Sequence, residues 1–306
     1  MTELGLTLAD LRGGQRRLRK EAAVRRTFFA AASLSVVISS LIVFALVREA
    51  WTFVSQVEWA ALTADGWYPR RGEYGVLSIL TSSLIVTGVA MLVALPVGLG
   101  AAMYLSEYAA PRVRAVLKPV LEVLAGIPSV VLGFFALTFI SPEIIQPIFD
   151  GSQRFNRLAA GIGVGILTIP LVASISEDAM RAVPGALREA SFGLGARKVT
   201  TTVRVVVPAA ISGLVAAVIV AVSRAIGETM VVFIAGGLVG AYSLDPLDPG
   251  VTMTAAMAQL ASGSDAVVGE ALTFQSLFFV GLVLFVITLL LNVVADRVVR
   301  RVRQRY

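Results

Sequence analysis

Two charged residues stand inside a long apolar stretch and are the strongest candidates for chemistry in this sequence. Arg224 and Glu228 lie four residues apart within Ala221–Met230. A charge at mid-membrane costs about 2.5 to 3.5 kcal/mol, so such residues usually face a pathway or one another. On a continuous helix the two would share a face. Two interpretations stay open: an ion pair that holds helices together, or a guanidinium that offers bidentate donors to a passing oxyanion while the carboxylate orients it.

The composition removes most enzyme chemistry. The sequence has no cysteine and no histidine, which excludes thiolate metal sites, Ser-His and Cys-His dyads and the commonest general base. It also lacks a GxxxxGK[ST] loop, so the chain by itself cannot bind ATP in the P-loop manner. We therefore expect no catalytic residue, no metal ligand and no cofactor bound by this chain.

The apolar content predicts an all-α, polytopic membrane protein. Hydrophobic residues make up 57% of the chain and charged residues 15%, with a net charge of +6. The basic residues lie beside apolar runs, which favours membrane lipid over nucleic acid as their partner. A bilayer core needs about 20 apolar residues in a helix, and the stretches of that length are Phe28 to Val47, Val76 to Leu105, Pro119 to Ile140, Leu158 to Ile175, Pro208 to Val239, and Leu272 to Ala295.

These six stretches predict one transmembrane domain over residues 28–295, between basic tails at 1–27 and 296–306. With six spans, both tails and the loops at 106–118 and 176–207 fall on one side. That side carries twenty lysines and arginines, whereas the other carries five, namely Arg48, Arg70, Arg71, Arg154 and Arg157. Since cytoplasmic loops are enriched in Lys and Arg, we expect both termini in the cytoplasm, with the protein in the bacterial plasma membrane.

Prolines and glycines inside the spans predict bends and close contacts. Prolines at 96, 128 and 170 should bend the second, third and fourth spans, because each removes a backbone hydrogen bond. Gly161, Gly163 and Gly165 predict a packing face, since small residues four apart let helix backbones approach closely.

The inner loop at about 177–208 is longer than a plain connection between helices requires. Pro184 fits the first turn of a helix, and residues 186–192 can continue it. Gly193 and Gly195 then allow the positive φ that ends such a helix. The loop therefore predicts a short helix on the cytoplasmic surface.

This loop resembles that of the permease subunits of bacterial ABC importers. Their pattern is Glu-Ala-Ala, three residues, Gly, nine residues, Ile, one residue and Leu-Pro, and here these positions hold Glu189, Ala190, Ser191, Gly195, Val205, Val207 and Pro208. The resemblance implies the type I ABC importer permease fold. It also implies that the region from Glu189 to Gly195 is the coupling helix, which seats in a groove of the cytoplasmic ATPase.

A second resemblance, to the PstC-type permease of the phosphate-specific importer, covers nearly all of the chain beyond the basic tail. It is carried by W-Y-P and Y-G in Trp67–Gly75, G-L-G-A-A-M-Y-L-S-E-Y-A from Gly98, L-E-V-L-A-G-I-P-S-V-V-L-G-F-F from Leu121, S-I-S-E-D-A-M-R-A-V-P from Ser174 and S-R-A-I-G-E-T-M from Ser223. In that family the Arg and Glu of the last phrase are implicated in ion passage, which implies this role for Arg224 and Glu228. Where the family often has Gly-Thr, this chain has Ser82-Ser83.

The same resemblance implies the partners of the chain. They are a second, similar permease of the PstA type, two PstB-type ATPase subunits that bind ATP and Mg²⁺, and an extracytoplasmic phosphate-binding protein of the PstS type. Within the class, the alternative is a permease for sulfate, molybdate or another oxyanion. From a different class, an ion-coupled secondary transporter should show an inverted repeat or a pair of broken helices, and the sequence indicates neither. An intramembrane enzyme is disfavoured by the missing His and Cys.

Overall fold

The computed structural model describes residues 15–262 and 271–302 of the chain. The chain divides into two compact units, residues 1–49 and 50–306. The described part of the first unit is a single helix, α2 (Gln15–Gln56), whose last turns belong to the second unit. This helix begins well before Phe28, the predicted start of the first span, because the basic segment ahead of it is made mostly of good helix formers. Residues 1–14 of the predicted basic tail lie outside the described residues.

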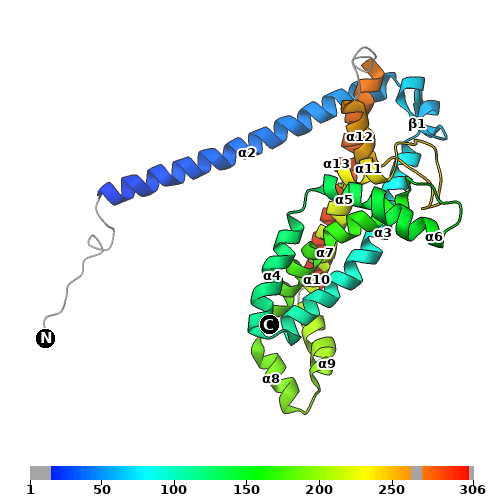
Figure 1. The fold of residues 1–306 in the computed structure, drawn as a ribbon. Coiled ribbons are helices and arrows are strands. Elements are labelled where there is room, and N and C mark those ends of the chain that lie inside the picture. Colours follow the sequence, from blue (N-terminus) through cyan, green and yellow to red (C-terminus); the bar gives the residue numbers. More distant parts are fainter. Residues whose placement is uncertain (1–14, 263–270, 303–306) are drawn as a thin grey trace, which may run out of the picture. The chain divides into compact units, whose positions relative to one another are not determined.

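The second unit is a helical assembly with a small outer ribbon (Figure 1). The ribbon and its flanking turns are η1 (Trp59–Thr63), β1 (Trp67–Tyr68), η2 (Pro69–Arg71) and β2 (Glu73–Tyr74), and the two strands pair antiparallel. The helices are α3 (Val76–Met103), η3 (Tyr104–Tyr108), α4 (Pro111–Ala125), α5 (Ser129–Phe135), η4 (Ala136–Ile145), α6 (Gln146–Ile148), α7 (Arg157–Arg181), α8 (Gly185–Gly193), α9 (Lys198–Thr201), η5 (Thr202–Val206), α10 (Val207–Ile226), α11 (Met230–Ala235), α12 (Met253–Ala261) and α13 (Ala271–Val302). The segments η3, η4 and η5 are π-helical.

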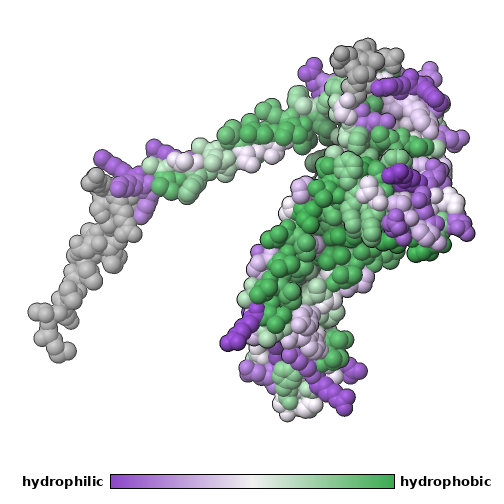
Figure 2. Space-filling model, in the orientation of Figure 1, coloured by the Kyte–Doolittle hydropathy of each residue, from purple (hydrophilic) through white to green (hydrophobic). Residues whose placement is uncertain are grey.

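Six helices of the described chain are long and apolar enough to cross a membrane, as the sequence predicts. They are Arg19–Gln56, Val76–Tyr108, Ser129–Ile148, Arg157–Arg181, Lys198–Ile226 and Leu272–Arg301. Within residues 50–306, Figure 2 shows apolar residues covering the middle of the visible face and hydrophilic residues gathered toward its ends. An apolar surface between two polar ends suits a protein whose solvent is hydrocarbon at mid-height and water outside.

Helices α3 and α7 approach closely because glycines lie between them. A Cβ atom built on Gly161 would lie 2.6 Å from the Cβ atom of Val89, and one on Gly165 would lie 2.8 Å from that of Val93. Gly163 faces the other side of α7, toward η4 and α11. The predicted packing face is confirmed, and it serves two sets of neighbours at once.

The prediction of one continuous third span over Pro119–Ile140 is wrong. Helix α4 ends at Ala125, and α5 begins at Ser129 with Pro128 as its N-cap, at φ −58° and ψ 132°. Proline has no N–H to donate and disfavours helical geometry in the residue before it, so the expected bend at Pro128 is a complete break. The prolines at 96 and 170 stay inside α3 and α7.

The prediction of one continuous fifth span over Pro208–Val239 is also wrong. Helix α10 ends at Ile226, and α11 runs only over Met230–Ala235. The chain then turns at Gly237, whose φ is 83°. Non-helical backbone inside a membrane protein is tolerated where protein buries it or where it lines a cavity. The broken helix that the sequence did not indicate is therefore present, and by itself it does not separate an ABC permease from a secondary transporter.

The glycine contacts between α3 and α7 predict the outcome of a matched pair of substitutions. Gly161→Ala should destabilise the protein by about 1 to 3 kcal/mol, because its methyl group overlaps Val89. Gly88→Ala on α3 is the control, since nothing lies within 4 Å of its Cβ position, and alanine there favours the helix. Thermal unfolding in detergent measures both variants. Equal unfolding temperatures for the two would contradict the close contact.

Candidate functional site

The interruption between α10 and α11 places Glu228 at the start of α11. Its Oε1 atom accepts hydrogen bonds from the backbone N–H groups of Met230 at 3.1 Å and Val231 at 3.4 Å. Because the first N–H groups of a helix lack intrahelical partners, this carboxylate caps α11. Of the two interpretations that the sequence left open, the ion pair between Glu228 and Arg224 is not found among the described residues. The helix that would have aligned them ends at Ile226.

Arg224 is half-buried in the last turn of α10, among otherwise apolar residues. Its guanidinium has neither a hydrogen bond nor an ion pair with any residue that the structure describes. A guanidinium keeps its charge and carries five donors, and an unpaired charge at membrane depth is unfavourable. The part of the chain that the structure describes therefore leaves this guanidinium without a compensating charge.

Two hydrogen bonds place the start of α12 between this interruption and α3. The Thr254 hydroxyl donates to the Glu228 carbonyl at 2.8 Å, and the Ser83 hydroxyl of α3 accepts from the Met253 N–H at 3.0 Å. In the sequence, Ser83 stands out only as a departure from the family's usual residue. A hydroxyl inside an apolar span is nevertheless a signal that predicts a polar contact.

Arg157 is fully buried at the start of α7 and organises the loop that follows α11. The guanidinium donates to the carbonyls of Ser243 at 2.7 Å, Asp245 at 2.5 Å and Asp248 at 3.3 Å, and to the Ser82 hydroxyl at 3.3 Å. Buried charges are tolerated when hydrogen bonds satisfy them. Counting cations along the sequence placed Arg157 with the outer loops but could not distinguish it from an exposed arginine.

Glu177, near the other end of α7, is fully buried and neutralised by cations of α4. Its Oε1 lies 2.5 Å from Arg114 Nη2, and its Oε2 accepts from Lys118 Nζ at 2.9 Å. Lys118 also contacts Asp178 at 2.7 Å. The carboxylates of Asp178 and Glu177 together raise the pKa of Lys118. Since α4 has no buried residue of its own, these charges are a large part of what joins it to α7.

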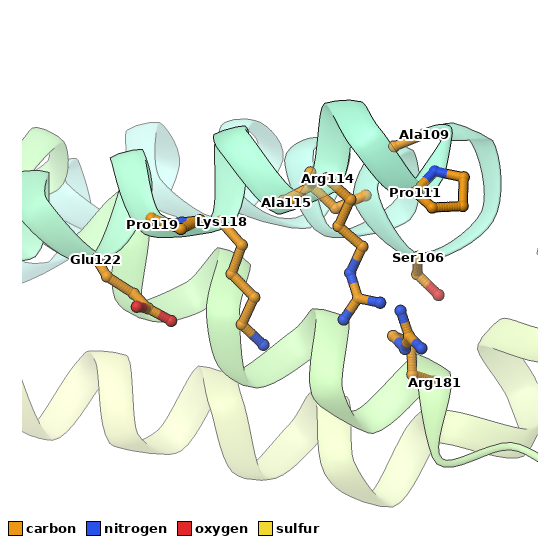
Figure 3. Close-up of a pocket in the computed structure, with 10 residues that line it drawn as sticks. Ser106, Ala109, Pro111, Arg114, Ala115, Lys118, Pro119, Glu122 and Arg181 are labelled. Carbon is orange, nitrogen blue, oxygen red and sulfur yellow. The ribbon is translucent and has the colours of Figure 1, made fainter.

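A cavity of about 480 Å³ lies beside these charges, against α4 and the end of α7. Figure 3 shows Arg114, Lys118 and Arg181 directed into the space between the two helices. All three of these cations are paired with Glu177, Arg181 at the longest distance of 3.9 Å, and Glu122 adds a carboxylate to the lining. The cavity therefore offers an anion little uncompensated positive charge.

The predicted short helix in the loop at about 177–208 is present as α8. It begins directly after Pro184, ends at Gly193, and is followed by Gly195 at φ 80°. Of the two glycines expected to take a positive φ, only Gly195 does so, because Gly193 still belongs to the last turn of the helix. Figure 1 shows α8 and α9 side by side at the end of the helical assembly.

Of the residues that match the importer pattern, those from Glu189 to Gly195 lie on α8 and just beyond it, whereas Val205 lies in η5 and Val207 and Pro208 begin α10. Glu189 and Ala190 are exposed, and Ser191 is half-buried, with its hydroxyl 2.8 Å from that of Thr201 in α9. Leu194, between α8 and Gly195, is 90% exposed. A large apolar side chain presented this fully to water is typical of a surface that another protein covers.

The fold is that of a polytopic helical membrane protein with an exposed short helix, α8, and comparison with known proteins identifies its family. Residues 94–306 match the family described as the inner membrane component of binding-protein-dependent transport systems. The chain belongs to this family, as a multi-pass protein of the bacterial inner membrane.

Among its relatives are proteins named for phosphate transport. The chain is 32% identical over 303 residues to the phosphate transport system permease protein PstC of Mesorhizobium japonicum, covering 93% of this chain and 91% of that protein. It is 35% identical over 256 residues to PstC 1 of Mycobacterium tuberculosis, covering 77% and 75%. It is 39% identical over 204 residues to the probable ABC transporter permease protein YqgH of Bacillus subtilis, covering 66% and 65%.

Solved structures confirm the predicted ABC importer permease fold. A chain of a bacterial ABC transporter that imports alginate superposes with a TM-score of 0.61 at 13% identity, covering 94% of this chain and all of that one. A chain of the inward-facing MetNI methionine ABC transporter gives a TM-score of 0.54 at 20% identity, covering 75% of this chain and 95% of that one.

The burial of Arg157 predicts a strong effect of its removal. Arg157→Met should lower the free energy of unfolding by about 3 kcal/mol or more, because three carbonyls lose a charged donor. Arg154→Met is the control, because Arg154 is exposed three residues earlier. Chemical denaturation in detergent measures the difference. Indistinguishable curves for the two variants would show that the loop does not depend on Arg157.

Proposed function

We propose that this chain is a permease subunit of an ATP-driven phosphate importer and forms half of the translocation pathway through the plasma membrane. The observation that carries the proposal is the 32% identity to the PstC protein of Mesorhizobium japonicum, which extends over 93% of this chain. The alignment covers nearly the whole chain, so it includes the helices that would line a pathway as well as the cytoplasmic loop.

Arg224 is the residue that we propose to contact the ion. Its half-buried guanidinium has no partner among the described residues, and its planar donors match the oxygens of phosphate. Glu228 acts indirectly, because its carboxylate caps α11 and thereby fixes the backbone of the interruption. Its charge also lowers the local attraction for an anion, which favours release, and passage requires binding that is not too tight.

Energy for transport comes from a partner. The sequence has no P-loop, so ATP and Mg²⁺ bind to a cytoplasmic ATPase dimer of the PstB type, and this chain catalyses no reaction. The contact with the ATPase is α8 and the turn after it, where Glu189, Ala190 and Leu194 are exposed. This arrangement requires both termini to lie in the cytoplasm, in agreement with the excess of cations there.

The other half of the pathway is a second permease of the PstA type. The chain is 30% identical over 230 residues to PstA 1 of Mycobacterium tuberculosis, which supports a pair of similar subunits. An extracytoplasmic phosphate-binding protein of the PstS type delivers the ion to the outer side. A transporter for sulfate or molybdate, or an ion-coupled secondary transporter, would share some of these features, and the uptake experiments below separate them.

Substitution at Arg224 tests the pathway. In proteoliposomes with the complete transporter, Arg224→Gln should reduce uptake of labelled phosphate about tenfold or more, and Arg224→Lys should retain part of it, because lysine keeps the charge but not the bidentate geometry. Excess sulfate should not compete. Wild-type uptake by Arg224→Gln would remove this residue from the pathway, and competition by sulfate would indicate a different oxyanion.

Two substitutions at Glu228 separate its capping from its charge. Glu228→Gln keeps an oxygen that can accept from Met230, so it should preserve the fold and alter only the rate of phosphate uptake. Glu228→Ala removes the cap and should also lower the unfolding temperature, as the loss of a helix cap costs about 1 kcal/mol. Equal stability of the two variants would show that the cap is not needed.

Substitution at Gly195 tests the coupling. Gly195→Val should leave the protein inserted but uncouple transport from ATP hydrolysis, since a β-branched residue is strained at a φ of 80° and would displace the turn after α8. Gly195→Asn is the control, because asparagine tolerates this conformation. ATP hydrolysis and phosphate uptake are measured on the same vesicles. Unchanged uptake per ATP in Gly195→Val would count against α8 as the coupling element.

A further inference from the structure

Arg188 joins α8 to the cytoplasmic end of α3. Its Nη2 donates to Glu107 Oε1 at 2.9 Å, and its Nε donates to Glu107 Oε2 at 3.3 Å. The same guanidinium donates to the carbonyls of Met180 at 2.8 Å and Val183 at 2.7 Å, at the end of α7. The Glu107 side chain is only 6% exposed. A bidentate pair that is shielded from water holds its geometry far better than an exposed ion pair.

Helix α9 contacts the same segment through a different residue. Lys198 Nζ lies 5.0 Å from the centre of the Tyr108 ring, within the range of a cation–π interaction. Tyr108 directly follows Glu107 in η3. Both helices of the cytoplasmic loop therefore contact one segment of five residues, α8 through an ion pair and α9 through an aromatic ring.

The segment that receives these contacts is π-helical. The Ala109 N–H donates to the Tyr104 carbonyl at 2.8 Å, a bond across five residues that gives η3 a wider turn than the α-helix before it. Such turns are frequent at functional sites in proteins. Because η3 continues α3 without a break, a displacement of η3 displaces α3.

Helix α3 connects η3 to the interruption that follows Arg224. From Glu107 to Ser83 the helix spans roughly 35 Å. The Ser83 hydroxyl accepts a hydrogen bond from the Met253 N–H, and the hydroxyl of the neighbouring Thr254 donates one to the carbonyl of Glu228. The cytoplasmic loop and the candidate ion site are thus joined through α3 and the first turn of α12.

We propose that Glu107 and Lys198 are positioning residues that transmit movement of α8 and α9 through η3 into α3, and so to the backbone at Glu228. This inference rests on the proposed function, because it requires a partner ATPase that moves α8. Loss of either contact should let the cytoplasmic helices move without displacing α3, so ATP is consumed with less transport.

The test uses the complete transporter in proteoliposomes and measures ATP hydrolysed per phosphate taken up. Glu107→Gln and Lys198→Met should each raise this ratio, and the double variant should raise it by about threefold or more. The controls are Glu122→Gln, an exposed carboxylate at the same end of the protein, and Arg197→Met, an exposed cation next to Lys198. Both controls should keep the wild-type ratio.

A merely structural role gives a different result. If the contacts only stabilise the fold or the assembly, hydrolysis and uptake fall together and the ratio stays constant, which overturns the proposal. Lys198→Met keeps the test valid if Glu107→Gln folds poorly, because Lys198 is exposed. Should the wild-type vesicles show no ATP-dependent phosphate uptake at all, the proposed function fails, and that outcome is visible before any variant is compared.

Discussion

Charged side chains that are shielded from water must be compensated by hydrogen bonds or by opposite charges, and the rest of this structure depends on that constraint. Arg157 and Glu177 are the fully buried charged residues in the described chain, and both are satisfied: one by loop carbonyls, the other by Arg114 and Lys118. The shielded pair of Glu107 and Arg188 follows the same rule. Arg224 departs from it. An uncompensated guanidinium among membrane helices is unfavourable for the fold, and the proposed contact with a permeating anion would explain why it is there.

The compensated charges also divide the molecule into parts that are fixed and parts that can move. Glycine contacts join α3 to α7 without room for adjustment, so these helices form a rigid pair. Helix α4 has no buried residue and is joined to α7 largely through polar contacts, and α8 is joined to the pair through Arg188. Movement imposed on α8 from outside therefore reaches the rigid pair through a few named side chains. The proposed role in ATP-driven transport requires only that a partner moves α8.

Sequence reasoning found the architecture because it depends on composition and local pattern. Apolar stretches of membrane length predicted the six spans. Pro184 as a helix start signal and Gly195 as a helix stop signal predicted α8. It failed where long-range contacts decide the conformation. The residues around Gly227 and Glu228 do not show that the fifth span breaks there. A glutamate that caps a new helix and a glutamate that pairs with an arginine one turn earlier look alike in sequence. The side-chain partners of Arg157, and the Arg188 partner of Glu107, lie 75 or more positions away along the chain, so a single sequence could not reveal them.

The central claim is that this chain is a pathway without a source of energy of its own. The most direct measurement compares labelled phosphate uptake into proteoliposomes that hold this chain alone with uptake into vesicles that also hold the second permease, the ATPase and the binding protein. The account predicts accumulation against a gradient only in the complete set and only with hydrolysable ATP. Accumulation by the purified chain without any ATPase, driven by an ion gradient, would contradict it and make the protein a secondary transporter.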